Sequence, residues 1–269
     1  MKWKPRDYIF FFAFIPLVLA LIFVLPDKSS LILHPTAPTL LSIFFSNYVH
    51  LEFWHFFANL AMYLIVVFVL FNIETDKKMF YRISALLFIA LPIISSLSII
   101  YFMPKLNNAS GFSAVVAGFL GYLLYATYNY AKRSLKARIS SNSVTALFGL
   151  NVAISAFDLG SLITGAACLV IALALIYMER KGISDLSRRM RLRIKDYRKQ
   201  GNRRFIPMSL FFFVWIALLF WLIVLLYMNV ENGTMTNIFA HYVGYMFGLF
   251  VPFALEGISK TGMSAKRKA

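Results

Sequence analysis

Four polar side chains in otherwise apolar segments have the residue types that acyl transfer requires. They are one serine, two histidines and one amide: Ser113, His55, His241 and Asn59. Polar side chains are costly inside a lipid bilayer, so each one in an apolar segment is a functional candidate. Serine supplies a nucleophile and histidine a general base, and an imidazole with an amide can donate hydrogen bonds to an oxyanion. These residue types predict acyl-transfer chemistry if the fold brings them to one depth.

The polar residues near position 55 follow a helical spacing. His55 and Asn59 are four residues apart and share one helix face, and His50 lies just before that helix. A zinc site is one alternative, because two imidazoles and an amide can ligate zinc, but no Asp, Glu or Cys joins them at this depth in the apolar runs. Interhelical hydrogen bonding is a second alternative, because buried polar residues commonly serve it in membrane bundles.

Ser113 and His241 each lie on a helix face that carries small residues. Ser113 and Gly121 are eight residues apart and lie near one face. Gly244 and Gly248 follow His241 by three and seven residues and lie on its face. Small residues at this spacing let helices pack closely, so a packing seam alone also explains them. By itself, His241 is equally well explained as a hydrogen-bonded core residue.

The composition places these residues in a membrane protein. The chain has 269 residues, of which 60% are hydrophobic, 17% aromatic and 14% charged, whereas soluble globular domains have about 45–50% apolar and about 25% charged residues. Too few polar residues remain to cover the surface of an ordinary soluble domain. The single cysteine, Cys168, excludes an intramolecular disulfide and a cysteine-based zinc site. We therefore expect an all-α, polytopic membrane helix bundle.

Eight apolar runs approach or reach the roughly 20 residues that a helix needs to cross a bilayer. They lie near residues 8–25, 53–73, 80–103, 113–131, 142–158, 160–178, 206–228 and 235–255. The fifth run is the weakest, and only a short break separates it from the sixth. The first run lacks a small-residue cleavage site and is followed by further spans, so we expect a span there and not a cleaved signal peptide.

The basic residues predict the orientation of this bundle. The chain has 27 Lys and Arg against 11 Asp and Glu, a net charge of +16. If the N-terminus is cytoplasmic, all basic residues except Lys28 and Lys105 fall in cytoplasmic segments. The positive-inside rule then predicts a multi-pass protein of the cell membrane with both termini in the cytoplasm. The expected organisation is a cytoplasmic tail at 1–7, a transmembrane domain at 8–257 and a basic cytoplasmic tail at 258–269.

The segment 179–205 is the most basic part of the chain, with eleven Lys and Arg. A nucleic-acid surface is one interpretation of such a segment. A solvated cytoplasmic loop that faces anionic lipid headgroups explains the same residues without a further partner. We therefore expect anionic lipid headgroups as partners at the cytoplasmic face, and no nucleic acid.

This topology brings the polar residues to one depth. The second, fourth and eighth spans all run from outside to inside. Ser113, His241 and the pair His55 and Asn59 therefore lie near the outer ends of three different helices. A nucleophile, a general base and oxyanion donors at one depth are the set that acyl transfer requires.

Together these motifs resemble those of the rhomboid family of intramembrane serine proteases. Residues 46–63, SNYVHLEFWHFFANLAMY, are similar to the family's second-helix signature H-x4-H-x3-N, and Glu74 resembles a glutamate often found at the inner end of that helix. GFSAVVAGFLGY at 111–122 is similar to the nucleophile motif G-x-S-G with its following small residues. AHYVGYMFG at 240–248 is similar to the family's final A-H-x2-G-x3-G helix.

The resemblance implies a role for each matching residue. Ser113 would be the nucleophile and His241 its general base in a Ser-His dyad. His55, Asn59 and a backbone N–H near Ser113 would stabilise the oxyanion. The supporting motif positions are Gly111, Gly118, Gly121, Gly244, Gly248 and His50, the last a structural position near the membrane interface. The resemblance implies single-span membrane proteins as substrates, and neither a metal nor a cofactor.

The chain departs from the family pattern at several points. Ala114 stands where glycine is usual, and Ala117 where many bacterial members have an aromatic residue. Three spans separate the serine and histidine helices, whereas the family has one, so we expect about eight helices around a six-helix core. By connectivity, the run at 206–228 takes the place of the family's gate helix, and the pair at 142–178 is an additional hairpin outside the core.

Ser110 is a rival nucleophile, because Ala109-Ser110-Gly111 also reads like the family's A-S-G. The downstream spacing favours Ser113, whose fifth and eighth following residues are both glycines, as in the motif. At the same two positions after Ser110, only the eighth residue is a glycine.

Two other functions compete with a protease. A rhomboid-like pseudoprotease would bind membrane clients without cutting them, but such proteins usually lose the serine or the histidine, and this chain has both. A transporter with a histidine proton relay fits the number of spans, but the inner halves lack paired ionisable residues and no inverted repeat is visible. We therefore predict a serine endopeptidase that hydrolyses a peptide bond near the outer end of transmembrane substrates.

Overall fold

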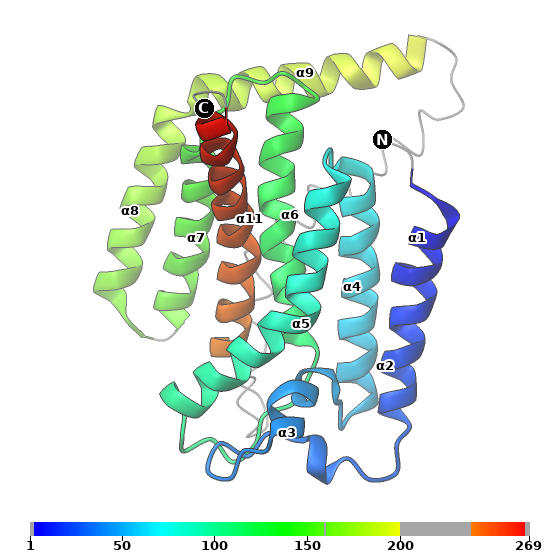
Figure 1. The fold of residues 1–269 in the computed structure, drawn as a ribbon. Helices are drawn as coiled ribbons and strands as arrows, with labels where there is room; N and C mark the ends of the chain where they lie inside the picture. Colours follow the sequence, from blue (N-terminus) through cyan, green and yellow to red (C-terminus); the bar gives the residue numbers. More distant parts are fainter. Residues whose placement is uncertain (1–2, 159, 200–237, 267–269) are drawn as a thin grey trace. The chain divides into compact units, whose positions relative to one another are not determined.

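The computed structural model describes residues 3–158, 160–199 and 238–266, and nearly all of these are helical (Figure 1). Within these ranges the only extended pairing is an antiparallel bridge between Leu33 and Ala109. The expected all-α class is confirmed. The chain forms two compact units, one with the described residues of 1–72, 76–125 and 236–269, the other with those of 73–75 and 126–235.

The first unit holds most of the candidate site. Its helices are α1 (Pro5–Ile9), a π-helical turn (Phe10–Phe14), α2 (Ile15–Phe23), α3 (Leu40–Phe45), α4 (Phe53–Ile73), α5 (Lys77–Phe102), α6 (Ser113–Arg133, whose last turns belong to the second unit) and α11 (Ile238–Lys266). Short 3-10 turns lie at Ser29–Leu31 and Ser46–Tyr48. Figure 1 shows that α4, α6 and α11 all begin at the same end of this unit.

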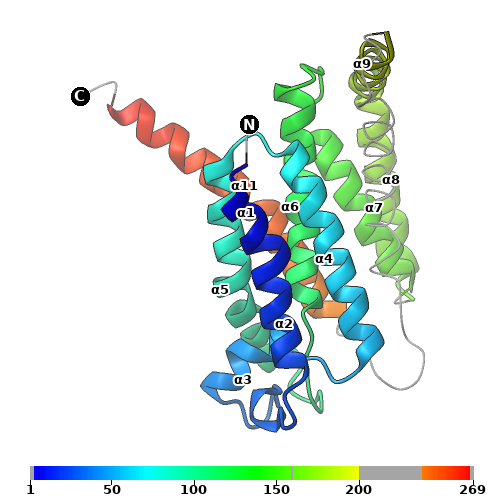
Figure 2. The same ribbon diagram turned by 90° about the vertical axis from the view of Figure 1, so that its right-hand side faces the viewer.

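The second unit contains α7 (Asn142–Asp158), α8 (Leu162–Met178) and α9 (Arg180–Lys199). Helices α7 and α8 lie side by side as a hairpin in both views (Figures 1 and 2). A small-residue contact supports this pairing, because a Cβ on Gly149 would lie 3.3 Å from the Cβ of Ala172. The two helices predicted over 142–178 are therefore present.

Three described helices are long and apolar enough to cross a membrane: Pro5–Phe23, Phe53–Ile73 and Lys77–Phe102. Helices α8 and α9 add a fourth if this bent pair forms one span. This number is consistent with a multi-pass membrane protein. The run predicted at 206–228 and the first residues of the run at 235–255 lie outside the described residues.

Two segments differ from the expected organisation. The segment 179–205, expected as a loop, is helical over Arg180–Lys199. Its Arg, Lys, Leu and Met residues favour helix, and the carboxylate of Asp185 pairs with Arg188 and Arg189 three and four residues on, each at 2.7 Å. The last helix continues past residue 257 to Lys266, so the expected tail at 258–269 begins as part of α11.

A proline in α5 holds the segment that precedes α4. Pro92 has no N–H, so the carbonyl of Phe88, four residues earlier, lacks its helical donor. The Tyr48 hydroxyl donates to that carbonyl. The side-chain amide of Asn47 donates to the Pro92 carbonyl at 3.2 Å. The 3-10 turn at Ser46–Tyr48 is therefore attached to α5 at the proline.

The N-terminal helix is fixed by aromatic rings and one buried carboxylate. Trp3 stacks on Phe71 with 4.0 Å between the ring centroids. Asp7 is only 3% exposed and accepts hydrogen bonds from Lys77 and Tyr81 at the start of α5. A buried carboxylate requires such partners, so these contacts tie the first helix to α5.

Candidate active site

Ser113 is the first residue of α6. The N–H groups in the first turn of a helix have no partner within the helix and lie at the positive end of its dipole. Gly111, two residues earlier, has φ +130°, which glycine adopts readily. The Gly111 N–H donates to the Ser46 carbonyl at 2.9 Å. The turn therefore holds the Ser113 hydroxyl beside backbone donors of the kind that bind anions.

The His55 imidazole and the Ser113 hydroxyl border the same small space. A Cβ on Gly111 would lie 3.1 Å from His55 Cε1, 3.6 Å from His55 Nε2 and 3.8 Å from Ser113 Oγ. The side chain of any other residue at position 111 would fill this space, so the glycine leaves it free between the imidazole and the hydroxyl. The structure thus brings together two of the predicted site residues, from α4 and from α6.

His50 positions the residue before Ser113. Its side chain is buried, and the Phe112 N–H donates to His50 Nε2 at 3.2 Å. Burial, reinforced by the neighbouring His55, lowers the pKa of His50 to about 3. The ring is therefore neutral at pH 7 and can accept this hydrogen bond. It also packs edge-on against His55, with 5.3 Å between the ring centroids.

Asn59 is buried one turn after His55 on α4. Its side-chain amide donates to the His55 carbonyl at 2.9 Å. This hydrogen bond runs along α4 and not toward the residues around Ser113. Of the two predicted oxyanion donors on α4, the structure therefore places the imidazole of His55 at the serine and leaves the amide bonded to its own helix.

Helix α11 packs directly against the backbone of α6. A Cβ on Gly244 would lie 2.1 Å from the Ala114 carbonyl oxygen, and one on Gly248 would lie 1.8 Å from that of Gly118. Gly121 of α6 meets the backbone of α11 just as closely. The glycines form the packing seam that their spacing predicts. No larger residue fits at these contacts, so the seam determines how α11 lies on α6.

This seam brings His241 to the start of α6. The histidine lies one turn before Gly244, which abuts Ala114, and directly after Ala240. Nε2 of His241 is buried and has no hydrogen-bond partner within the described part of the chain. The serine and histidine therefore lie on adjacent helix starts, without a hydrogen bond between Ser113 Oγ and His241 Nε2.

A cavity of about 20 Å³ lies beside Ser113, which is enough for one water molecule. It is lined by Ser46, Asn47, Ile99, Ala109, Ser110, Gly111, Ser113, Ala114 and Ala240. Both candidate nucleophiles, Ser110 and Ser113, therefore face the same space.

Sequence reasoning did not single out Ser46 and Asn47 as site residues. The available signal is an adjacent pair of polar residues a few positions before His50, at the start of the same motif. In the structure both are buried, and the Asn47 amide donates to Ser96 Oγ at 3.1 Å.

No protein-family model, curated protein or solved structure matches this chain. The chemistry of the site is therefore inferred from its own residues and geometry. Within the described residues no three His, Cys, Asp or Glu side chains gather where they could hold a metal ion. The groups around Ser113 are a hydroxyl, two imidazoles and backbone N–H donors, the residue types of nucleophilic acyl transfer.

Proposed function

We propose that this chain is an intramembrane serine endopeptidase of the rhomboid type. The observation that carries the proposal is that the His55 imidazole and the Ser113 hydroxyl border one space at the start of α6. The glycine seam between α6 and α11 supports it, because the seam brings His241 to the same end. The proposal includes about eight spans, a cell-membrane location and both termini in the cytoplasm, as the distribution of basic residues indicates.

In the proposed mechanism Ser113 Oγ attacks the scissile carbonyl carbon while His241 accepts its proton. The oxyanion accepts hydrogen bonds from His55 and from N–H groups in the first turn of α6. Asn59 has a second amide hydrogen for the same purpose. His241 then protonates the leaving amine, and water activated by His241 hydrolyses the acyl-enzyme. A Ser-His contact that tightens only when substrate binds is usual for catalytic pairs.

The proposed substrates are single-span membrane proteins, cut near their outer end. Peptide carbonyls in a helix are hydrogen-bonded, so the substrate must unwind locally, which small or helix-weakening residues near the cut would ease. The cavity holds about one water, so a peptide must also displace the residues that line it. Ile99 of α5 and Ala240 of α11 both line the cavity, so we propose that these helix ends separate to admit substrate.

Two single substitutions test this proposal. In detergent or proteoliposomes, Ser113→Ala should lower cleavage of a fluorescent transmembrane substrate by at least about a thousandfold. It should also abolish labelling by a fluorophosphonate. The matched variant Ser110→Ala, at the other serine of the cavity, should retain both substrate cleavage and fluorophosphonate labelling. Cleavage and labelling that persist in Ser113→Ala but vanish in Ser110→Ala would make Ser110 the nucleophile, and persistence in both variants would exclude the proposed site.

A rhomboid-like pseudoprotease is the second candidate. It is favoured by two observations: His241 Nε2 makes no hydrogen bond with Ser113 among the described residues, and the cavity beside Ser113 is small. Such a protein would bind membrane clients without cutting them. Client binding that Ser113→Ala leaves unchanged, in a wild-type protein that no fluorophosphonate labels, would support this function over the first.

A further inference from the structure

One side of α9 is fixed to the segment that follows α6. The Arg138 N–H donates to the Asp185 carboxylate at 3.1 Å, and the Arg189 guanidinium donates to the Leu135 carbonyl at 3.2 Å. A Cβ on Gly182 would lie 2.5 Å from the Arg138 carbonyl oxygen, so the backbones touch there. These contacts set the rotation of α9 about its own axis and occupy one of its sides.

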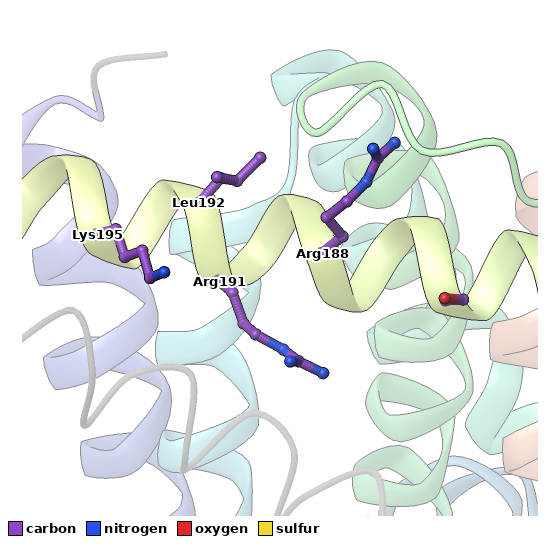
Figure 3. Close-up of a pocket in the computed structure, with 5 residues that line it drawn as sticks. Arg188, Arg191, Leu192 and Lys195 are labelled. Carbon is purple, nitrogen blue, oxygen red and sulfur yellow. The ribbon is translucent and has the colours of Figure 1, made fainter.

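A different side of α9 is exposed and basic. There a hollow of about 380 Å³, here called the α9 hollow, is lined by Ser184, Arg188, Arg191, Leu192 and Lys195. Figure 3 shows Arg191 and Lys195 extending from one edge of the helix and Arg188 and Leu192 from the other. Arg188 is already paired with Asp185. Arg191 and Lys195 form no salt bridge with any carboxylate in the described residues.

The exposed surface of α8 indicates the depth at which α9 begins. Val170, Ile171 and Leu173 are each more than half exposed, as lipid-facing side chains would be. Tyr177, at the end of α8, is 65% exposed, and the Arg180 guanidinium lies 4.1 Å from its ring centroid. Exposed tyrosine beside a basic residue is typical of the membrane–water interface. Helix α9 therefore begins at headgroup level.

The bend between α8 and α9 directs α9 away from the course of the span. The two helix axes differ by 63°. Helix α9 contains nine Lys and Arg and only two Asp. A strongly basic helix that leaves a span at the interface lies where anionic headgroups are concentrated.

We propose that the α9 hollow binds the phosphate of an anionic phospholipid headgroup. Arg191 and Lys195 donate to the phosphate oxygens, the Ser184 hydroxyl supplies a further donor, and Leu192 contacts the apolar part of the lipid. A lipid is the occupant because α9 continues directly from α8, whose apolar side chains are exposed. A nucleic acid would instead require a basic surface clear of the membrane.

A pair of matched double variants tests the proposal in the full chain in neutral detergent. Binding of phosphatidylglycerol and of phosphatidylcholine is measured by native mass spectrometry. The wild type should prefer phosphatidylglycerol, and R191Q/K195Q should weaken phosphatidylglycerol binding by about tenfold or more, since each hydrogen bond from a charged donor to the phosphate contributes about tenfold or more. The control K181Q/R193Q removes the same charge from exposed positions of α9 outside the hollow and should weaken binding by less than about threefold, because exposed charges without a direct contact contribute little.

Several outcomes would overturn the proposal. Equal weakening in the two variants would mean that overall charge, and not the hollow, holds the lipid. Displacement of the lipid by millimolar inorganic phosphate would make the hollow a site for free phosphate. Binding of transfer RNA that R191Q/K195Q abolishes while lipid preference stays intact would assign the hollow to nucleic acid. Ser113→Ala should bind phosphatidylglycerol like the wild type, so the result does not depend on proteolysis.

Discussion

The start of α6 and helix α9 use polar residues in opposite ways. Around Ser113 four polar side chains are buried, and His50 and Asn59 bond to the backbone: His50 accepts from the Phe112 N–H and the Asn59 amide donates to the His55 carbonyl. The buried four are Ser46, Asn47, His50 and Asn59. On α9 the basic side chains are many and mostly exposed, and two of them, Arg188 and Arg189, pair with Asp185 of the same helix. The first region therefore depends on the placement of single atoms, and the second on the sum of many charges.

This difference shows that burial determines how much each polar group contributes to the free energy of unfolding. Leaving one buried donor or acceptor without a partner costs about 1–3 kcal/mol. Exposed ion pairs contribute little and are screened by salt. The region around Ser113 should therefore tolerate few substitutions and respond little to ionic strength, whereas α9 should tolerate many and respond to salt.

The largest expected effect is in the glycine seam. Gly248→Ala places a methyl group 1.8 Å from the Gly118 carbonyl oxygen. Backbone cannot rotate away as a side chain can, so we expect a loss of about 3 kcal/mol or more in the free energy of unfolding. The control is Gly257→Ala in the same helix, where a Cβ would meet nothing within 4 Å. Thermal unfolding in detergent should show a large fall in Tm for the first variant and none for the second; equal Tm values would contradict the close α6–α11 contact.

A smaller effect is expected in the pH dependence of stability. The folded chain holds the pKa of His50 at about 3, because the ring is buried, against 6.5 in the unfolded chain. Between these values the unfolded chain binds a proton that the folded chain does not. The contribution of the neutral His50 ring to the free energy of unfolding is therefore complete above pH 6.5, and it is lost progressively as the pH is lowered toward 3.

His50→Gln isolates this contribution. The glutamine carbonyl oxygen can still accept from the Phe112 N–H, but the side chain does not titrate. We expect Tm of this variant to fall less steeply than that of the wild type between pH 6.5 and 4. Parallel curves for the two proteins would show that His50 is not the buried neutral group described above.

The smallest expected effect is on α9. Hydrogen bonds from Arg188 and Arg189 hold the pKa of Asp185 well below its usual range. Asp185→Asn removes both ion pairs but keeps an acceptor for the Arg138 N–H. We expect a small fall in Tm at low salt that disappears in 1 M NaCl. The Gly248→Ala effect should persist in 1 M NaCl, and a similar salt dependence of both variants would remove the distinction between the two regions.

Helical spacing predicted the parts of the site that lie on regular helices. Gly244 and Gly248 share the face of His241, and their role in close packing follows from that spacing alone. The contacts of Ser46 and Asn47 could not be predicted in this way, because they depend on which loop lies against which helix. Nor could the orientation of the Asn59 amide, since a side chain on a predicted face still has several rotamers.

The basic segment shows a different limit of sequence reasoning. The low hydropathy of 179–205 identifies this segment as a polar connection between spans, so the sequence predicts a loop there. Helix α9 forms because helix-favouring residues and the pairs of Asp185 with Arg188 and Arg189 act at short range. Mean hydropathy contains no information about such pairs.

The proline in α5 also connects this helix to the turn before Ser113. A helix that lacks one internal donor bends easily at that point. In α5 the carbonyl without its helical donor is that of Phe88, and it accepts a hydrogen bond from the Tyr48 hydroxyl. Two residues before Tyr48, the Ser46 carbonyl holds the Gly111 N–H. Flexing of α5 at Pro92 would therefore pull on the turn that ends at the Ser113 hydroxyl. Pro92 thus links any bending of α5 to the position of Ser113, through Tyr48, Ser46 and Gly111.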